Sequence, residues 1–523
     1  MNKPVFPHPL LMGAAPVLFM YAHNLNESQI RDLGLPLAIC VAIAGAIWGL
    51  LTLLLRSAVS GTLAASITLL VLGSYGHIYN LVGGRALGSI IFGRNRYLMP
   101  CLFLILAASA YFMFRCRRDP WVAKANRLTG YYSVIMVSMS LLQIGIFQVH
   151  RIQAASGPAL PPALALPPPD SLQSAGPGAP RSAGPRIRPD IYYIIPDAYG
   201  SDSALKEVYG FDNSAFTGYL KAKGFIVASR SRSNYAFTEL SITSSLNMDY
   251  LNFLTERMGI ESADETYTDH LLMNNRVMAF LQGEGYTLVN AGSWWGPTSR
   301  NTHADVNYRT SRINEFTLNV MQGSILLPFL EEFTENELRH KVLYAFDKLA
   351  EVPYMEAPTF TLAHIICPHN PFIFGPEGEK VSTFRRLKYK ADSRELYLDQ
   401  VKFVNGKLME AVAKILERSP TPPVIIIQGD HGGAFLHHAV VRAGELPDND
   451  FLREQMGIMN AYYLPGAGPD AVSDSISPVN SFRIVFNTYF GANLPLLPDE
   501  SYYSTLYKPF AFTNVTAIAK HGR

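Results

Sequence analysis

Two apolar runs in the sequence end on residues whose side chains bind metal ions. The first run, residues 190–197, closes on Asp197, and the second, residues 424–428, is followed after one glycine by Asp430 and His431. Apolar, β-branched runs of this length are typical of buried parallel strands. Open α/β sheets bind ligands at the carboxyl ends of such strands, and a carboxylate with an imidazole suits a divalent metal. The pattern therefore predicts a metal or ligand site at these two strand ends.

A hydroxyl-rich segment, residues 234–247, offers a candidate nucleophile. Its sequence is NYAFTELSITSSLN, in which Thr238 and Ser241 lie three residues apart. Hydroxyl side chains ahead of an apolar-periodic run indicate a helix N-terminus. A hydroxyl at that position lies at the positive end of the helix dipole, which favours the alkoxide and attracts anions. The alternative is that these side chains only cap the helix and cover its polar face.

Histidines mark two further loops. His369 lies in the run HIICPHNPF, residues 364–372, where two prolines constrain a loop that follows an apolar stretch. A lone loop histidine is usually structural, but one that follows a buried strand of an α/β sheet is a better site candidate. His437 and His438 follow His431 by six and seven residues. Because adjacent residues on a helix point apart, at most one of this pair is expected to reach the site.

The composition predicts a membrane part. Charged residues make up 16% of the 523 residues and the mean hydropathy is +0.10, with most of the hydrophobic excess before residue 150. Five apolar stretches are candidates for membrane-spanning helices. They are residues 9–21, 37–55, 62–81, 97–114 and 131–149. The short first stretch has the core of a signal peptide as its alternative, but no small-residue cleavage site follows it.

The charges of the connecting loops predict the orientation of these spans. With the N-terminus inside, the inner segments hold more Lys and Arg than the outer loops, which is the usual bias. The inner residues are Lys3, Arg56, Arg115, Arg117, Arg118, Lys124 and Arg127, and the outer ones are Arg31, Arg85, Arg94 and Arg96. Five spans then place everything after residue 150 outside the cytoplasm.

Three regions follow from these patterns: a transmembrane helical domain at 1–149, a linker at 150–189 and an extracytoplasmic domain at 190–523. The linker contains ten prolines among Ala, Gly and Ser, a composition that forms no packed core. In the last region apolar strands alternate with amphipathic helices, expected at 215–223, 277–284 and 396–416. This order predicts an α/β fold with a mostly parallel central sheet.

The net charge and the number of cysteines give no support to two classes of protein, those that bind nucleic acids and those built on disulfides. The net charge of +2 gives no argument for a nucleic-acid partner. Of the four cysteines, Cys40, Cys101 and Cys116 lie in or beside apolar stretches and Cys367 stands alone, so that a disulfide framework is not expected.

These patches together resemble the alkaline phosphatase/sulfatase superfamily, and within it the membrane-anchored branch of lipoteichoic acid synthases and phosphoethanolamine transferases. That branch combines five membrane helices, a linker and an extracytoplasmic sulfatase-like domain. The resemblance implies that an acidic residue after the first strand, a threonine nucleophile opening a helix and a late Asp-His pair bind one divalent metal, either Mn, Mg or Zn. The matching residues are Asp197, Thr238, Asp430 and His431, with Thr238 chosen on the pattern TELS. The run PHNPF resembles the substrate-side histidine loop of the family and nominates His369.

The sequence also departs from the family pattern. Sulfatases carry a Cys-x-Pro-Ser-Arg signature, and Thr238, Leu240 and Ile242 stand here in place of its Cys, Pro and Arg, which disfavours sulfate ester hydrolysis. A second metal would need a further Asp-His-His set. The available histidines are His364, His369, His437 and His438, but no matching carboxylate is evident, and one metal is therefore expected.

A head-group pocket is implied near residues 292–300, GSWWGPTSR. Trp295 and Arg300 are the candidate substrate-binding residues there, together with His369, His437 and His438, and with Trp294 and His303 as weaker candidates. The alternative is that both tryptophans belong to the core and that the arginine is solvated.

The resemblance implies a metal-dependent phosphotransferase of the cytoplasmic membrane, whose catalytic domain is extracytoplasmic. It would transfer a phosphoglycerol- or phosphoethanolamine-type group from a membrane phospholipid to an envelope glycan or lipid through a phospho-threonine, with His369 as acid/base or as a phosphate ligand. Two alternatives remain at this stage: a phosphodiesterase or phosphatase that acts on envelope phosphate esters, and a non-catalytic membrane scaffold. The sequence does not predict the oligomeric state.

Overall fold

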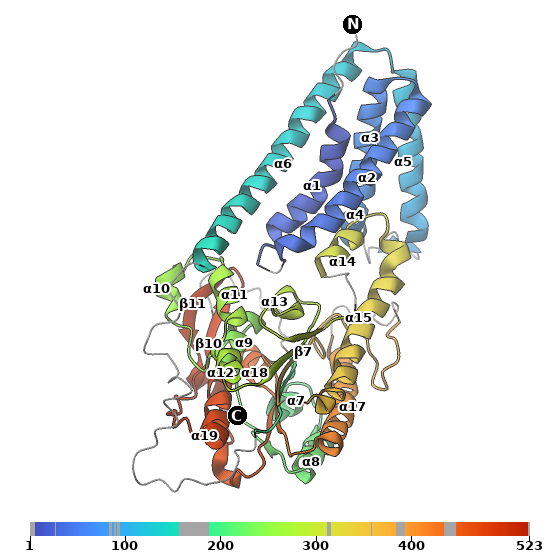
Figure 1. The fold of residues 1–523 in the computed structure, drawn as a ribbon. Helices are drawn as coiled ribbons and strands as arrows, with labels where there is room; N and C mark the ends of the chain where they lie inside the picture. Colours follow the sequence, from blue (N-terminus) through green and yellow to red (C-terminus); the bar gives the residue numbers. More distant parts are fainter. Residues whose placement is uncertain are drawn as a thin grey trace. The chain divides into compact units, whose positions relative to one another are not determined.

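The computed structural model describes residues 6–26, 28–82, 86–87, 90–91, 95–155, 188–310, 315–356, 358–382, 393–433 and 446–520. The chain forms two compact units (Figure 1). The first, here called the helical unit, is Met1–Gln153 with Ser311–Glu337, and the second, the α/β unit, is Ala154–Thr310 with Leu338–Arg523. The sequence did not predict that a segment between two strands of the α/β unit belongs to the helical unit.

The helical unit contains apolar helices that match the five predicted stretches. They are α1 (His8–His23), α2 (Ile30–Leu55), α3 (Ala58–Gly73), α4 (Tyr75–Val82), α5 (Asn95–Arg115) and α6 (Pro120–Ala155), with a short hairpin of β1 (Ala86–Leu87) and β2 (Ile90–Ile91) before α5. In the part of the chain that the structure describes, three helices are long and apolar enough to cross a membrane: Ile30–Leu55, Asn95–Arg115 and Pro120–Gln153. The third predicted stretch is interrupted, because α3 ends at Gly73 and α4 begins at Tyr75.

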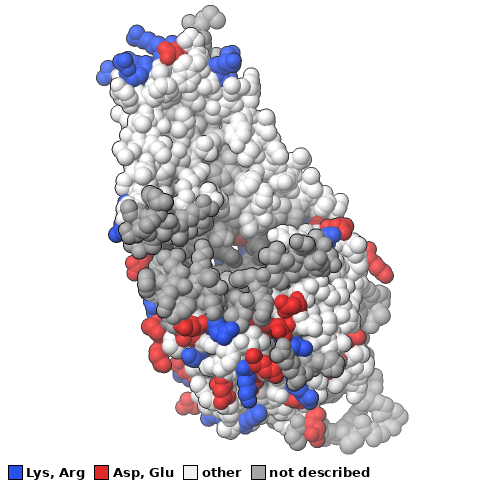
Figure 2. Space-filling view, turned by 180° about the vertical axis from the view of Figure 1, so that it is seen from behind, with Lys and Arg blue, Asp and Glu red and all other residues white. Residues whose placement is uncertain are grey.

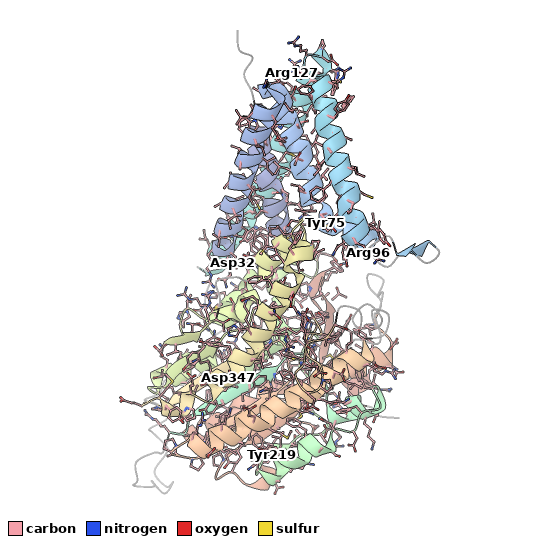
Figure 3. The ribbon with its side chains drawn as sticks, turned by 90° about the vertical axis from the view of Figure 1, so that its right-hand side faces the viewer. Asp32, Tyr75, Arg96, Arg127, Tyr219 and Asp347 are labelled. Carbon is pink, nitrogen blue, oxygen red and sulfur yellow. The ribbon has the colours of Figure 1, made fainter. Side chains whose placement is uncertain are left out.

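The surface of the helical unit is largely uncharged. Figure 2 shows Lys and Arg gathered at one end of this unit, next to a broad face without charged side chains. Arg127 lies at that end, whereas Asp32, Tyr75 and Arg96 lie toward the other (Figure 3). Large apolar side chains such as Leu53, at 76% exposure, and Leu104, at 70%, cover the outside of α2 and α5. A helix that is apolar all round in this way is typical of a membrane-spanning segment.

The α/β unit is built on a seven-stranded sheet in the order β4-β9-β8-β3-β7-β5-β6. Its strands are β3 (Ile191–Pro196), β4 (Ile226–Val227), β5 (Thr287–Ala291), β6 (Val306–Tyr308), β7 (Thr359–Ile365), β8 (Val424–Gln428) and β9 (Asn460–Tyr463). The pairs from β8 through β3, β7 and β5 to β6 are parallel, and β9 runs antiparallel to both β8 and β4. The predicted fold class, a helical N-terminal region followed by an α/β domain with a mostly parallel sheet, is confirmed.

Further helices lie between and after the strands in the sequence. In chain order they are α7 (Asp202–Glu207), α8 (Ser214–Ala222), α9 (Thr238–Asn247), α10 (Leu254–Met258), α11 (Thr266–Met273), α12 (Arg276–Gly283), α13 (Gly296–Ser299), α14 (Glu315–Gln322), α15 (Leu327–Leu349), α17 (Arg394–Arg418), α18 (Asn449–Met456), α19 (Ser481–Phe490) and α20 (Thr516–Lys520). Of these, α14 and the first part of α15 belong to the helical unit. A hairpin of β10 (Tyr502–Thr505) and β11 (Lys508–Asn514) completes the chain. The helices expected at 215–223, 277–284 and 396–416 correspond to α8, α12 and α17.

The central strands are buried because both faces of the sheet are covered. Every residue of β3, β7 and β8 is buried. A large apolar cluster includes Ile191 and Tyr193 of β3, Phe360 of β7, Ile426 of β8 and Phe482 of α19. This burial explains why the strands read as continuous apolar runs in the sequence rather than as alternating patterns.

The turn after β8 is packed too closely for any side chain at Gly432. A Cβ atom there would lie 1.8 Å from the backbone oxygen of Glu454, which belongs to α18. Gly432 also donates its backbone N–H to the backbone oxygen of Gln455 at 2.7 Å. The turn and α18 are therefore in backbone contact, and this contact fixes the chain immediately after His431.

We expect Gly432→Ala to lower the unfolding free energy of the full-length protein by about 1–3 kcal/mol, because the backbone must shift to admit the methyl group. Thermal unfolding in detergent micelles measures the effect. Gly468→Ala is the matched control, since a Cβ atom at Gly468 meets nothing within 4 Å. Equal melting temperatures for the two variants would contradict the packing described here.

Candidate metal centre

Three adjacent parallel strands bring acidic and histidine side chains to one edge of the sheet. Asp197 follows β3, His364 lies near the end of β7, and Asp430 and His431 follow β8. The register pairs Ile195 with His364 and aligns β3 with β8 on its other side. Because the strands are parallel and in register, their carboxyl ends meet at the same edge. The three sequence positions predicted to lie together, Asp197, Asp430 and His431, therefore do so.

The distances between these side chains define a compact cluster. Asp197 Oδ1 lies 3.6 Å from His431 Nε2, and Asp197 Oδ2 lies 3.4 Å from His364 Nε2. His431 Nε2 also lies 3.7 Å from Asp430 Oδ2. Two groups of three residues have potential ligand atoms within 4.8 Å of one another: Asp197, His369 and His431, and Asp197, His364 and Asp430. Asp197 belongs to both groups and so forms the centre of the cluster.

Each histidine of the cluster is oriented through its Nδ1 atom. His431 Nδ1 lies 2.8 Å from the Gly432 backbone oxygen, and His369 Nδ1 lies 2.6 Å from the Asn370 backbone oxygen. A carbonyl oxygen only accepts, so Nδ1 of these two rings carries the proton and Nε2 is the nitrogen with a lone pair in the neutral ring. His364 Nδ1 lies 2.7 Å from the Thr298 hydroxyl oxygen. Outer hydrogen bonds of this kind hold the histidine ligands of metal sites.

The cluster contains buried polar atoms that no hydrogen bond satisfies. Among the described residues these include Asp197 Oδ1, Asp430 Oδ2 and His364 Nε2. Asp430 Oδ1, in contrast, accepts a hydrogen bond from the Ala198 backbone N–H at 3.0 Å. Buried polar atoms without partners are costly and rare, and a metal ion is one group that compensates them. Two carboxylate oxygens and imidazole nitrogens facing one another suit a divalent cation, so the residues present fit the predicted metal.

The charges within the cluster shift the pKa values of its members. Burial by itself raises the pKa of Asp197, but the nearby His369, His364 and His431 lower it more, and the net pKa lies below the usual value. For His431, burial lowers the pKa, whereas Asp430, Asp197 and the Gly432 carbonyl raise it, and the net pKa lies above the usual value. The Asp197 carboxyl is therefore ionised at neutral pH, as a metal ligand must be.

The predicted nucleophile begins a helix that is tied to the cluster. Thr238 is the first residue of α9 and is half-buried. Three residues later, the Ser241 hydroxyl donates to the Asp430 backbone oxygen at 2.6 Å. Three residues of α-helix rise about 4.5 Å, so the N-terminus of α9 begins one turn away from this anchor. Phe237, the N-cap residue, makes no side-chain cap, and the first turn is thus not closed by a capping side chain.

The structure separates the predicted substrate-side residues. Trp295 packs edge-on against His364, with ring centroids 5.7 Å apart, and so adjoins the cluster. Trp294 is buried, whereas Arg300 and His303 are exposed. The predicted residues His437 and His438 lie outside the described residues. The assignment of catalytic, metal and substrate roles to individual residues stays a prediction.

His364 lies within the cluster, which the sequence pattern alone did not predict. On sequence grounds it was considered only as a ligand for a second metal, yet it is buried and lies 3.4 Å from Asp197. Thr298, which orients its ring, was not singled out at all. The available signal was the position of His364 near the carboxyl end of an apolar run, the same signal that identified Asp197.

No family model matches the sequence, and no curated protein matches it. Solved structures do match. The C-terminal periplasmic domain of EcEptC from Escherichia coli, in complex with Zn, matches 64% of this chain and 94% of its own, at 13% identity and a TM-score of 0.41. The integral membrane protein lipooligosaccharide phosphoethanolamine transferase A (EptA) from Neisseria meningitidis matches 97% of this chain and 98% of its own, at 13% identity and a TM-score of 0.41. A 2-O GAG sulfatase matches 59% of this chain and 72% of its own, at 13% identity and a TM-score of 0.38.

The structural neighbours are phosphoethanolamine transferases and sulfatases. At these identities and TM-scores the likeness assigns neither a substrate nor a residue role to this chain. Those assignments depend on the chemistry of its own side chains.

We expect Asp197→Asn to lower the affinity of the full-length protein for Zn or Mn about tenfold or more, because Asp197 belongs to both ligand groups. Elemental analysis after dialysis against a metal buffer measures the bound ion. Asp190→Asn is the matched control at the other end of the same strand, where Asp190 accepts hydrogen bonds from the backbone N–H and hydroxyl of Thr359. Metal content that is equal in wild type and Asp197→Asn would rule out this centre.

Proposed function

We propose that this protein is a metal-dependent phosphotransferase that moves a phospho-group from a membrane phospholipid to an acceptor of the cell envelope. The observation that carries the proposal is the buried cluster around Asp197, whose unsatisfied oxygen and nitrogen atoms lie beside a helix that begins with Thr238. Apolar helices that can span a membrane precede this domain and suit a lipid donor. In this proposal the helical unit lies in the cytoplasmic membrane with several spans, and the α/β unit is extracytoplasmic.

The proposed ligands are Asp197, Asp430, His431 and the Thr238 hydroxyl, with His364 close to the same carboxylate. A divalent ion held by such a set supplies Lewis acidity, which lowers the pKa of a hydroxyl and offsets charge on phosphoryl oxygens. The α9 N-terminus adds to that charge compensation, since its first backbone N–H groups attract anions. The proposed metal count is one, and its identity among Zn, Mn and Mg is open to direct analysis.

The proposed reaction has two displacement steps. In the first, Thr238 Oγ1 forms a bond to phosphorus and the bond from phosphorus to the lipid alcohol breaks, so that diacylglycerol leaves with the proton and the head-group phosphate stays on Thr238. In the second, an acceptor hydroxyl oxygen forms a bond to the same phosphorus and loses its proton, the bond from phosphorus to Thr238 Oγ1 breaks, and Thr238 takes up a proton. His369 is the proposed acid and base. Its Nδ1 proton is held by the Asn370 carbonyl, which leaves Nε2 for proton transfer.

Ser241 is the competing hydroxyl, and its contacts argue for a positioning role. It is 1% exposed and its proton is donated to the Asp430 backbone oxygen. Its own backbone oxygen accepts from Ser245 at 2.9 Å. A hydroxyl whose proton is already donated in this way holds α9 against the turn after β8, which carries Asp430 and His431. Such a hydroxyl is a poor nucleophile. Thr238, one turn earlier and half-buried, makes the better candidate.

We expect Thr238→Ala to abolish lipid turnover and Thr238→Ser to retain part of it, because the serine keeps the oxygen but loses the methyl group that restricts its rotamer. Full-length protein in micelles would be incubated with labelled phosphatidylethanolamine or phosphatidylglycerol without acceptor. Phosphopeptides would be mapped by mass spectrometry and released diacylglycerol counted. Ser241→Ala is the matched hydroxyl control on the same helix, and it should still accumulate phosphate on residue 238.

Two results would contradict this proposal. Phosphate found on Ser241, or unchanged turnover in Thr238→Ala, would remove Thr238 as the nucleophile. Continuous release of diacylglycerol and free head-group phosphate without acceptor, well beyond one equivalent per chain, would make the enzyme a hydrolase rather than a transferase.

A further inference from the structure

The segment Ser311–Glu337 lies between β6 and β7 in the sequence but packs within the helical unit. Phe316 of α14 is buried in a cluster with Leu18 and Tyr21 of α1 and Leu33 of α2. The rings of Phe316 and Tyr21 meet edge-on with centroids 5.6 Å apart. We refer to Ser311–Glu337 as the docking segment.

The docking segment is joined to the break between α3 and α4 by two backbone hydrogen bonds. In an uninterrupted helix the N–H of Gly76 would bond to the oxygen of Leu72, four residues earlier. Here the Gly76 N–H donates to the Gly323 oxygen at 3.0 Å, and the Leu72 oxygen accepts from the Ile325 N–H at 2.9 Å. The break thus exchanges one helical hydrogen bond for two bonds to the docking segment.

Gly76 is required for this arrangement. A Cβ atom at Gly76 would lie 2.3 Å from the Gln322 backbone oxygen and 2.8 Å from the Gly323 Cα atom. Any side chain would therefore push the docking segment away from the break. By contrast, a Cβ atom at Gly49 of α2 meets nothing within 4 Å.

Helical rise places this contact at the depth of a membrane. Gly61 of α3 packs against Thr52 of α2, since an added Cβ would lie 2.5 Å from the Thr52 Cα atom. Leu72 lies eleven residues beyond Gly61, about 16 Å along α3, and Arg56 lies about 6 Å from Thr52 in the opposite direction. The level of Leu72 and Ile325 is thus about 22 Å from that of Arg56. Taking the charged Arg56 as the inner edge of the hydrocarbon core, this level lies within its thickness of about 30 Å.

An apolar stripe follows this contact, on Leu326 and the first turns of α15, which begins at Leu327. Leu326, Phe329 and Phe333 are 42%, 67% and 41% exposed. Their spacing of three and four residues puts them on one face of the helix. Asn336, the next residue on that face, is polar and exposed. Phe333 lies about 10 Å along the helix from Leu326. This length is similar to the roughly 8 Å that remain between the level of Ile325 and the far edge of the hydrocarbon core.

We propose that Leu326, Phe329 and Phe333 contact the acyl chains of the membrane, and that the docking segment is a membrane-inserted element outside the N-terminal helices. Lipid is the occupant because the stripe belongs to the helical unit, whose helices α2 and α5 also expose large apolar side chains such as Leu53 and Leu104. The connection from α14 to α15 also satisfies its own backbone, as hydrocarbon requires. Ser324 N–H and hydroxyl both donate to the Met321 oxygen, and Leu327 N–H donates to the Ser324 oxygen.

A depth series along the stripe tests the proposal. In full-length protein whose four cysteines are replaced by alanine, single variants Leu326→Cys, Phe329→Cys, Phe333→Cys and Asn336→Cys carry an environment-sensitive fluorophore. The protein is reconstituted in vesicles of phosphatidylethanolamine and phosphatidylglycerol. We expect nitroxide-labelled lipid to quench the first two labels several-fold more than the label at 336, and aqueous iodide to show the reverse order.

Two outcomes would overturn it. Iodide that quenches the label at 329 as strongly as that at 336 would place the stripe in water. Labels at 326, 329 and 333 that neither quencher reaches would mean that protein, either another part of this chain or a second copy, covers the stripe. The result is independent of the chemistry at Thr238, since it requires no turnover.

The role of the backbone exchange is tested by Gly76→Ala in the Phe329→Cys background. We expect iodide quenching at 329 to rise at least twofold as the docking segment leaves the break, with Gly49→Ala unchanged as the matched control. Size-exclusion chromatography confirms that both variants remain folded and monodisperse. Quenching that stays the same in Gly76→Ala would show that the two hydrogen bonds do not hold the segment in place.

Discussion

The burial of one carboxylate, that of Asp197, constrains the arrangement of the whole candidate site. Removing an ionised carboxyl from water is costly unless charges and hydrogen bonds compensate it. Three strands in parallel register deliver that compensation, because β7 brings His364 and β8 brings Asp430 and His431 to the same edge. Shifting either neighbouring strand by one residue would turn its side chains to the other face of the sheet. The apolar runs that set the register are therefore as necessary to the site as the ligands themselves.

The second constraint is on α9, whose N-terminus must be held beside the ligands. Ser241 does this through the Asp430 backbone oxygen, and Gln428, at the end of β8, reaches Ser245 of the same helix at 3.5 Å. The helix is therefore fixed by hydrogen bonds to the strand that carries Asp430 and His431. A helix held in this way keeps its first turn in place without a capping side chain, and the backbone N–H groups of such a turn attract anions.

The sequence predicted those parts of the fold that local patterns determine. Buried strands appear as apolar runs, and a residue at the carboxyl end of such a run is a site candidate in an α/β fold; Asp197, Asp430 and His431 were found in this way. His364 was undervalued because it lies inside the run, where only the register with Ile195 shows that its ring reaches Asp197. Thr298 was missed because its contact with His364 joins residues 66 positions apart. The residues that orient a ligand are chosen by tertiary contacts, and no local pattern reports them.

The docking segment was not predicted either, because it is held by tertiary contacts with the helices. A hydropathy pattern detects long apolar stretches but no contact between segments that are distant in sequence. The interruption of the third predicted stretch at Ser74 is explained by its partners, because the Gly76 N–H and the Leu72 oxygen bond to Gly323 and Ile325 instead of to each other. In a medium without water an unpaired backbone group costs several kcal/mol, so the broken helix and the docking segment stabilise each other. An α/β domain separated from the helical unit would expose Phe316, which is buried against Leu18 and Tyr21. The boundary between the helical unit and the α/β unit therefore does not follow the chain: residues that lie beyond the linker in sequence complete the core of the helices that precede it.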